Sequence, residues 1–133
     1  NENYLRQVAE FDNFRKRTAK EKQDTYSYAL MKCITEFLPV MDNFERALAC
    51  ETQDTEYQKG IEMIYTQLTE MLKKLGVSEI EAEGKPFDPI LHNAVSQKED
   101  DNFGENVVCQ VFQKGYQLGD KVIRHAMVVV ANP

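Results

Sequence analysis

The chain has 133 residues, of which 42% are hydrophobic and 29% are charged, and its net charge is −6 at pH 7. A chain of this size supports one modest hydrophobic core with an extension, and its acidic balance argues against nucleic-acid binding, which needs clustered Lys and Arg. No segment approaches the ~20 consecutive apolar residues of a membrane-spanning helix, so we expect no membrane partner.

Residues 1–37 are predicted to form one long helix. Gly and Pro, which break helices, do not occur before position 39. Between Arg15 and Thr25 the only apolar side chain is Ala19, so this stretch cannot fold back onto a core. A lone polar helix is marginally stable in water. We therefore expect residues 1–37 to pair with a second copy as a coiled coil.

Residues 38–75 are predicted to form a helical hairpin. Two apolar seams recur at spacings of four and three: Leu30, Ile34, Phe37, Met41, Phe44 and Leu48, then Tyr57, Ile61, Ile64, Leu68, Met71 and Leu75. Pro39 lies off the first seam and is expected to kink or break the helix near Phe37 and Leu38. Gly76 is expected to end the second helix as a C-cap. Two such hairpins, from two chains, would form a four-helix bundle.

Residues 76–133 are predicted to form a small, mostly antiparallel β domain, because the apolar period changes from helical to two. Phe87-Asp88-Pro89 is expected to form a turn, since Pro cannot lie in a central strand. We expect a short element at 91–95, a strand at 107–112, another starting at 115–118, a turn at Gly119-Asp120 and the longest strand at 121–130. The predicted fold class is therefore α+β.

The sequence offers little catalytic chemistry. It has no GxSxG, P-loop or HExxH motif and no dinucleotide fingerprint. We interpret His92 as a partner of the backbone after the turn, and His125 as a residue on a strand face. The acidic run at 99–101 lacks the ligand spacing of a calcium loop. We predict a protein that is not an enzyme, has no catalytic residue and uses no metal or cofactor.

The cysteines indicate a reducing compartment. Cys33, Cys50 and Cys109 are odd in number and lack the CxxC spacing of a zinc site or redox pair. We interpret them as reduced thiols that fill small apolar packing sites.

A long, gapped signature extends through the C-terminal half of the chain. Its positions are Phe87, Asp88, Pro89, His92, Ala94, Gly115, Tyr116, Arg124, Ala126 and Val128. Further matches lie at residues 9–17 and 38–48. On these residues the chain resembles the GrpE family over nearly its whole length.

The resemblance implies a nucleotide exchange factor and co-chaperone of the stress response. In that family a parallel dimer of long helices leads into a four-helix bundle and two β domains. One β domain opens the nucleotide-binding cleft of a DnaK-type chaperone ATPase, so that ADP leaves. The implied partners are that ATPase domain and a second copy of this chain, in the bacterial cytoplasm. The alternative is a dimeric coiled-coil scaffold or tether whose β domain binds a different protein.

The resemblance also places six residues at or near the chaperone contact: Arg15, Arg46, Gly60, Phe112, Lys121 and Val130. Phe112 replaces a Met of the family, and Lys121 stands for an Arg, which loses bidentate geometry. A Gly inside a helix costs about 1 kcal/mol relative to Ala, and two explanations for Gly60 stay open. Either a partner backbone approaches it closely, or it accommodates packing of the hairpin.

Overall fold

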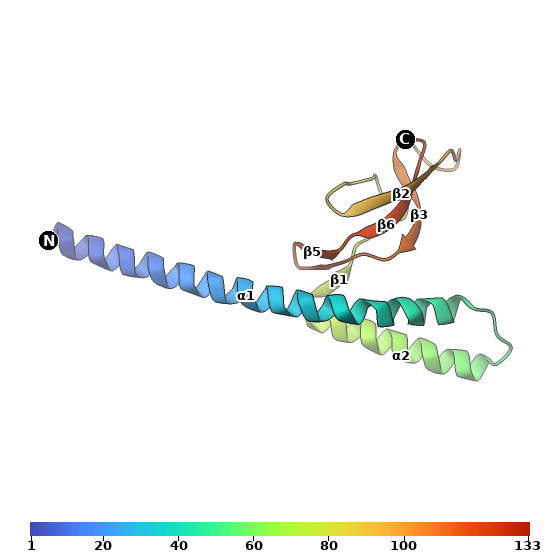
Figure 1. Cartoon of the computed structure of the whole chain (residues 1–133), viewed down its shortest axis with the longest axis horizontal. Helices are drawn as coiled ribbons and strands as arrows, with labels where there is room; N and C mark the ends of the chain where they lie inside the picture. The colour runs from blue at the N-terminus through green and yellow to red at the C-terminus, as the bar shows by residue number, and fades with distance from the viewer. The chain divides into compact units, whose positions relative to one another are not determined.

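A computed structural model of the chain describes all 133 residues, Asn1–Pro133. The chain divides into two compact units, Asn1–Cys33 and Ile34–Pro133. Along the chain the elements are α1 (Glu2–Ala49), α2 (Thr55–Lys74), β1 (Val77–Glu79), β2 (His92–Lys98), β3 (Val107–Gln113), β4 (Tyr116–Leu118), β5 (Lys121–Arg124) and β6 (Ala126–Ala131) (Figure 1). The fold is α+β, as predicted. Neither helix has the length and apolar character needed to cross a membrane.

The first unit contains the N-terminal part of α1, and its side chains are largely exposed. Asp12 forms ion pairs with Arg15, at 3.1 Å between Oδ1 and Nη2, and with Lys16, at 3.2 Å between Oδ2 and Nζ. The hydrogen bond and charge of Lys16, helped by Arg15, hold the pKa of Asp12 below its usual value. Large apolar side chains in this unit, Tyr4, Leu5, Val8, Phe11 and Phe14, are all exposed. The unit therefore buries no core of its own.

Pro39 was predicted to kink or break the helix, and the break does not occur, because α1 continues through Pro39 to Ala49. A Pro in a helix interior removes a backbone hydrogen bond and costs about 3 kcal/mol. Here Ile34, Leu38 and Met41 are buried on either side of Pro39, and Leu38 and Met41 have no exposed surface at all. Burial of such side chains contributes about 1.5–3 kcal/mol each, so packing offsets the cost of the proline.

Helix α2 has the boundaries that its end signals predict. The Asp54 side chain accepts a hydrogen bond from the Tyr57 backbone N–H at 3.0 Å, which satisfies a free donor of the first turn. At the other end Gly76 adopts a φ of 88° and donates its N–H to the Lys73 carbonyl at 3.0 Å. Such a left-handed conformation favours Gly, and the predicted C-cap is confirmed.

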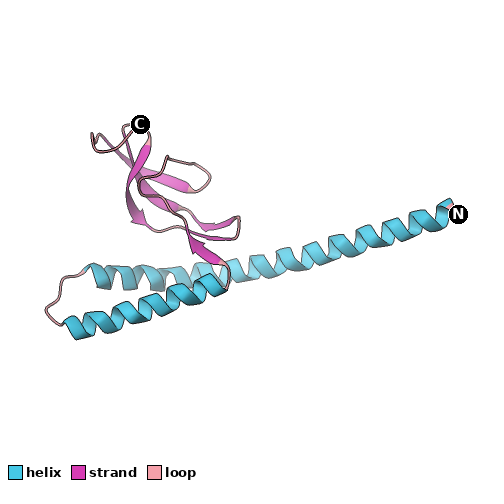
Figure 2. Ribbon diagram, turned by 180° about the vertical axis from the view of Figure 1, so that it is seen from behind, coloured by secondary structure: helices cyan, strands magenta, loops and turns pink.

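The predicted apolar seam of α2 is not its inward face within this chain. Leu72 is buried and Tyr65 and Leu68 are half-buried, whereas Ile64 and Met71 are exposed. Figures 1 and 2 both show α2 alongside the C-terminal part of α1. The helix therefore has one face that is buried or half-buried within the chain and a second apolar face that is exposed.

Six strands form two three-stranded sheets. One sheet has the order β1-β4-β5 and is antiparallel, with Val77 opposite Leu118. The other has the order β2-β6-β3, in which β2 runs parallel and β3 antiparallel to β6. The β part is thus mostly antiparallel, as predicted. Its core cluster lies around the second sheet and contains Ala82, Val108, Ala126, Val128 and Val130, with Phe87 and Val111 packed against it.

The predicted single strand at 121–130 is wrong. It divides at His125 into β5 and β6, which belong to different sheets. The break lies where Gly115 approaches the chain, since a Cβ built on Gly115 would be 2.4 Å from the Ala126 nitrogen. His125 is exposed in this break and does not lie on a strand face. The turn at Gly119 and Asp120 is confirmed, and Gly119 has a φ of 59°.

The expected packing role of the cysteines is wrong for two of them. Cys33 and Cys50 are exposed, and Cys50 lies just after the end of α1. Cys109 is half-buried, and its thiol donates to the Val129 carbonyl at 3.4 Å.

Candidate functional site

The histidines of this chain are placed for structure. The His92 ring is buried, its Nδ1 accepts a hydrogen bond from the Asp88 backbone N–H at 3.1 Å, and its centroid lies 5.9 Å from that of Phe87. The predicted bond of His92 to the backbone is confirmed. No group of three or more His, Cys, Asp or Glu residues is placed to hold a metal ion.

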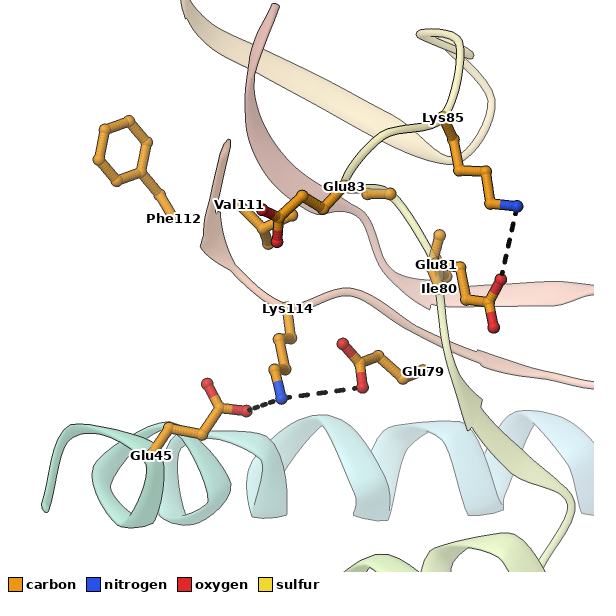
Figure 3. Close-up of a pocket in the computed structure, with 10 residues that line it drawn as sticks. Glu45, Glu79, Ile80, Glu81, Glu83, Lys85, Val111, Phe112 and Lys114 are labelled. Carbon is orange, nitrogen blue, oxygen red and sulfur yellow. Dashed lines mark ion pairs between the residues drawn. The ribbon is translucent and has the colours of Figure 1, made fainter. Parts of the chain in front are cut away.

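A cavity of about 370 Å³ lies between the C-terminal part of α1 and the β part. Figure 3 shows its lining side chains, which come from α1, from β1 and the segment after it, and from β3 and the residue that follows it. Four carboxylates line it, Glu45, Glu79, Glu81 and Glu83, together with Lys85, Lys114, Ile80, Ala82, Val111 and Phe112. Carboxylates outnumber ammonium groups here, so the cavity is acidic.

Lys114 connects both helices to the first sheet at the floor of this cavity. Its Nζ lies 3.3 Å from Glu45 Oε1 on α1 and 3.8 Å from Glu79 Oε2 on β1 (Figure 3). It also donates to the Tyr65 hydroxyl of α2 at 3.3 Å, and that hydroxyl donates to Glu45 Oε1 at 2.7 Å. Lys114 therefore links three elements, α1, α2 and β1, that all lie far from it in the sequence.

Burial and charge in this cluster favour the protonated forms of its donors. Burial, with the charge of Glu45 and its hydrogen bond, raises the pKa of Tyr65, and burial also raises that of Tyr116. Burial alone would lower the pKa of Lys114, but the negative charges of Glu45 and Glu79 outweigh it, so the pKa of Lys114 is raised. Lys114 therefore stays charged at neutral pH.

Arg124 forms a second connection, one turn along α1. Its Nη1 lies 2.7 Å from Asp42 Oδ2 and its Nη2 lies 2.8 Å from Asp42 Oδ1, which is a bidentate pair. The same guanidinium donates to the Lys114 carbonyl through Nε at 3.0 Å and also through Nη2. Gln113 donates to Asp42 Oδ2 at 3.2 Å. Asp42 thus receives side chains from two segments of the β part.

The positions of the gapped signature, which are far apart in the sequence, lie next to one another in the β part. In the parallel pairing of β2 with β6, His92 lies opposite Ala126 and Ala94 lies opposite Val128. The Ala126 N–H donates to the Leu91 carbonyl at 3.2 Å, directly after the Phe87-Asp88-Pro89 segment. Gly115 passes the same Ala126, and Arg124 lies over the ring of Tyr116 at 5.7 Å. These signature positions are therefore in contact with one another and form part of the packed framework of the β part.

Four of the six residues expected at a partner contact have exposed side chains. Arg15 is exposed in the first unit and is paired with Asp12. Arg46 is exposed in the last turn of α1, and Lys121 is exposed at the start of β5. Phe112 is 59% exposed on β3 at the border of the acidic cavity. A large exposed aromatic side chain is a common anchor for a protein partner.

Gly60 and Val130 are placed differently. A Cβ built on Gly60 meets nothing within 4 Å. Packing of the hairpin within one chain therefore does not require a Gly at this position. Val130 is 3% exposed and belongs to the core cluster, so its side chain supports the sheet from inside.

Asp42, Glu45 and Lys114 were not among the residues predicted from the sequence. A signal was present, because Asp42 and Glu45 are three residues apart and so lie on the same side of a helix, next to the apolar seam. Arg124 in an apolar strand pattern also needs a carboxylate partner. Which carboxylate meets which cation depends on the tertiary structure.

Sequence comparison with known proteins finds one family along nearly the whole chain. A family model described as GrpE matches residues 1–132. The chain is 53% identical over 128 residues to Protein GrpE of Clostridium acetobutylicum. That alignment covers 96% of this chain and 64% of the relative. It is 50% identical over 131 residues to Protein GrpE of Geobacillus stearothermophilus, covering 96% of this chain and 59% of that protein. It is 53% identical over 123 residues to Protein GrpE of Caldanaerobacter subterraneus subsp. tengcongensis, covering 92% and 60%.

The chain spans about three-fifths of the length of these relatives. Within that span the match is nearly complete, and it includes both helices and all six strands. The signature positions meet around one strand pairing in the β part, which explains why they are so far apart in the sequence. This protein belongs to the GrpE family.

Proposed function

We propose that this chain is a nucleotide exchange factor and co-chaperone that binds the ATPase domain of a DnaK-type chaperone, opens its nucleotide-binding cleft and promotes ADP release. The observation that carries the proposal is the family match over residues 1–132. The proposal includes a location in the bacterial cytoplasm, which rests on the bacterial sources of the relatives.

The proposed mechanism is differential binding and involves no covalent step. The factor binds the open, nucleotide-poor ATPase domain more tightly than the closed domain, so it shifts the population toward the open form. Linkage then requires that ADP and the factor weaken each other's binding by the same factor. Exposed Phe112, Arg46 and Lys121 are suited to this role, since an aromatic anchor with cations at the rim is typical of protein interfaces.

We further propose that the chain acts as a homodimer. In the second unit, exposed apolar side chains extend along both helices: Val40, Tyr57, Met63, Ile64 and Met71. A cavity of about 220 Å³ beside them is lined by Val40, Asn43, Phe44, Ala47 and Ile61. Exposed apolar surface of this kind marks a protein–protein contact. A second helical hairpin would cover it and complete a four-helix bundle.

Release of a fluorescent ADP analogue from a DnaK-type ATPase domain tests the exchange activity. We expect the chain to accelerate release, and charge reversal in Arg15→Glu or Arg46→Glu to weaken chaperone binding. Arg6→Glu is the matched control, because it makes the same change on the exposed part of α1. Absence of acceleration with several DnaK-type ATPase domains contradicts the proposal.

Sedimentation of the same variants tests the homodimer and separates the alternative function. An exchange factor loses chaperone affinity in Arg46→Glu while it stays a folded dimer. A coiled-coil tether for another protein would form the same dimer, yet neither wild type nor variant would change the rate of ADP release.

A further inference from the structure

We propose that Asp42 and Arg124, together with Glu45 and Lys114, hold the β part in a fixed orientation on the helical hairpin, and that this orientation is required for nucleotide exchange. We call these four residues the polar joint. They are positioning residues, because they act through the strands that they hold. The inference rests on the function proposed above and adds residues that the family resemblance did not assign.

The geometry of the polar joint suits orientation better than simple attachment. Asp42 and Glu45 lie on one side of α1, about one turn apart, and each accepts a cation from the β part. Two contacts along one helix oppose rotation about either contact. The bidentate pair of Arg124 with Asp42, at 2.7 and 2.8 Å, adds a fixed plane that a single ammonium contact lacks.

Partial burial makes the central pair of the joint strong. The side chains of Arg124 and Asp42 are 19% and 18% exposed. Solvent and salt screen such a pair less than an exposed one. Removing one charge also leaves the other poorly solvated, which costs more than the pair contributes when intact. The joint therefore resists opening at physiological ionic strength.

The polar joint is connected directly to the residues expected to meet the chaperone. Phe112 precedes Gln113, which donates to Asp42, and Lys114, which contacts Glu45. Lys121 begins β5, the strand that Arg124 ends. Forcing a cleft open requires a rigid element, because a β part that pivots would yield instead of the ATPase. A loosened joint should therefore leave binding nearly intact and lower the rate of release at saturation.

The first test separates affinity from maximal rate in the ADP-release assay. We expect Asp42→Asn and Arg124→Gln to lower the maximal acceleration roughly tenfold, while the concentration for half-maximal effect changes less than about threefold. Arg124→Lys should have an intermediate effect, because it keeps the charge and loses the bidentate geometry. Asp101→Asn, the same change at an exposed loop position, is the matched control and should behave as wild type.

The double variant shows whether the pair acts as one unit. If it does, Asp42→Asn with Arg124→Gln loses no more than the worse single variant. Losses that multiply overturn the proposal, as does an effect on affinity alone.

The second test measures orientation without the chaperone. Spin labels at Gln67 on α2 and Ser96 on β2, both exposed positions, report the distance between the hairpin and the β part. The full chain is used with its three cysteines replaced, and labelled chains are diluted with unlabelled ones, so that each molecule carries one labelled copy. We expect one narrow distance distribution in the parent and a broader or displaced one in Asp42→Asn and Arg124→Gln.

An unchanged distribution in both variants overturns the polar joint. A parent protein that never accelerates ADP release contradicts the proposed function instead, and the distance measurement still decides whether the joint fixes the orientation. The two failures are therefore distinguishable.

Discussion

Substitution of Gly115 by Ala should be among the most damaging single changes in this protein. A Cβ at position 115 would lie 2.4 Å from the Ala126 nitrogen, 2.7 Å from the Arg124 carbonyl oxygen and 2.8 Å from the His125 carbonyl carbon. All three are backbone atoms, which cannot rotate away as the end of a side chain can. The chain would have to move where β5 passes into β6, and that junction belongs to both sheets.

The expected cost follows from this geometry. Adding a methyl group to a well-packed site usually costs about 1–3 kcal/mol, and contact with backbone on three sides puts Gly115→Ala at or above about 3 kcal/mol. The unit that contains it runs from Ile34 to Pro133. In a domain of that size 1 kcal/mol shifts the thermal midpoint by about 4–8 °C. We therefore expect the midpoint to fall by at least about 12 °C.

Calorimetry and far-ultraviolet circular dichroism at matched protein concentration measure this shift. Gly104→Ala is the control, since a Cβ there meets only Val107 Cγ2 at an ordinary 3.5 Å, and it should change the unfolding free energy by less than about 1 kcal/mol. A Gly115→Ala protein as stable as the control would refute the reasoning, because it would show that the two sheets separate at this point without cost.

Three further outcomes are expected. Gly60→Ala should stabilise the isolated protein by about 0.5–1 kcal/mol, because the methyl group enters open space on a helix. In a chaperone binding assay the same variant should have a lower affinity, and an unchanged affinity would argue against close approach of a partner backbone. Leu38→Ala should cost about 2–5 kcal/mol by denaturant unfolding, since Leu38 is fully buried; a smaller loss would mean that the helices close the cavity. The stability that Lys114, Tyr65 and Tyr116 contribute should be complete below about pH 10 and be lost above it, because their raised pKa values mean that the folded state holds these protons more tightly. Urea midpoints that do not fall between about pH 10 and 11 would contradict this.

Local signals in the sequence predicted the helices and turns well. Gly76 follows the end of α2, and the turn at Gly119 and Asp120 joins β4 to β5, because caps and tight turns depend on a few neighbouring residues. The prediction failed at Pro39, where the local cost of a proline is outweighed by burial of Leu38 and Met41. That burial comes from tertiary packing, which the residues around Pro39 do not show by themselves.

Long-range pairing accounts for the other failures. Residues 121–130 alternate like one strand, yet the chain divides at His125, because Gly115 lets a distant backbone pass there. Alternation shows that a segment is extended, and it does not show in which sheet each half is paired. The predicted seam of α2 is divided in a similar way: Ile61 and Leu68 are half-buried and Ile64 and Met71 are exposed, because periodicity does not show which part of a seam is covered within one chain.

The sequence by itself determined the α+β class, the C-terminal end of α2, the turn at Gly119 and Asp120 and the family, because each depends on local propensity or on a signature that can be read along the chain. Only the tertiary structure decided that Arg124 meets Asp42 and that Lys114 meets Glu45 and Glu79. Many carboxylates in this acidic chain could pair with either cation. The packed helices and the close approach at Gly115 place the backbone, and this placement decides which carboxylate each cation reaches. The distance between a cation and a carboxylate in the folded chain cannot be read from their spacing in the sequence.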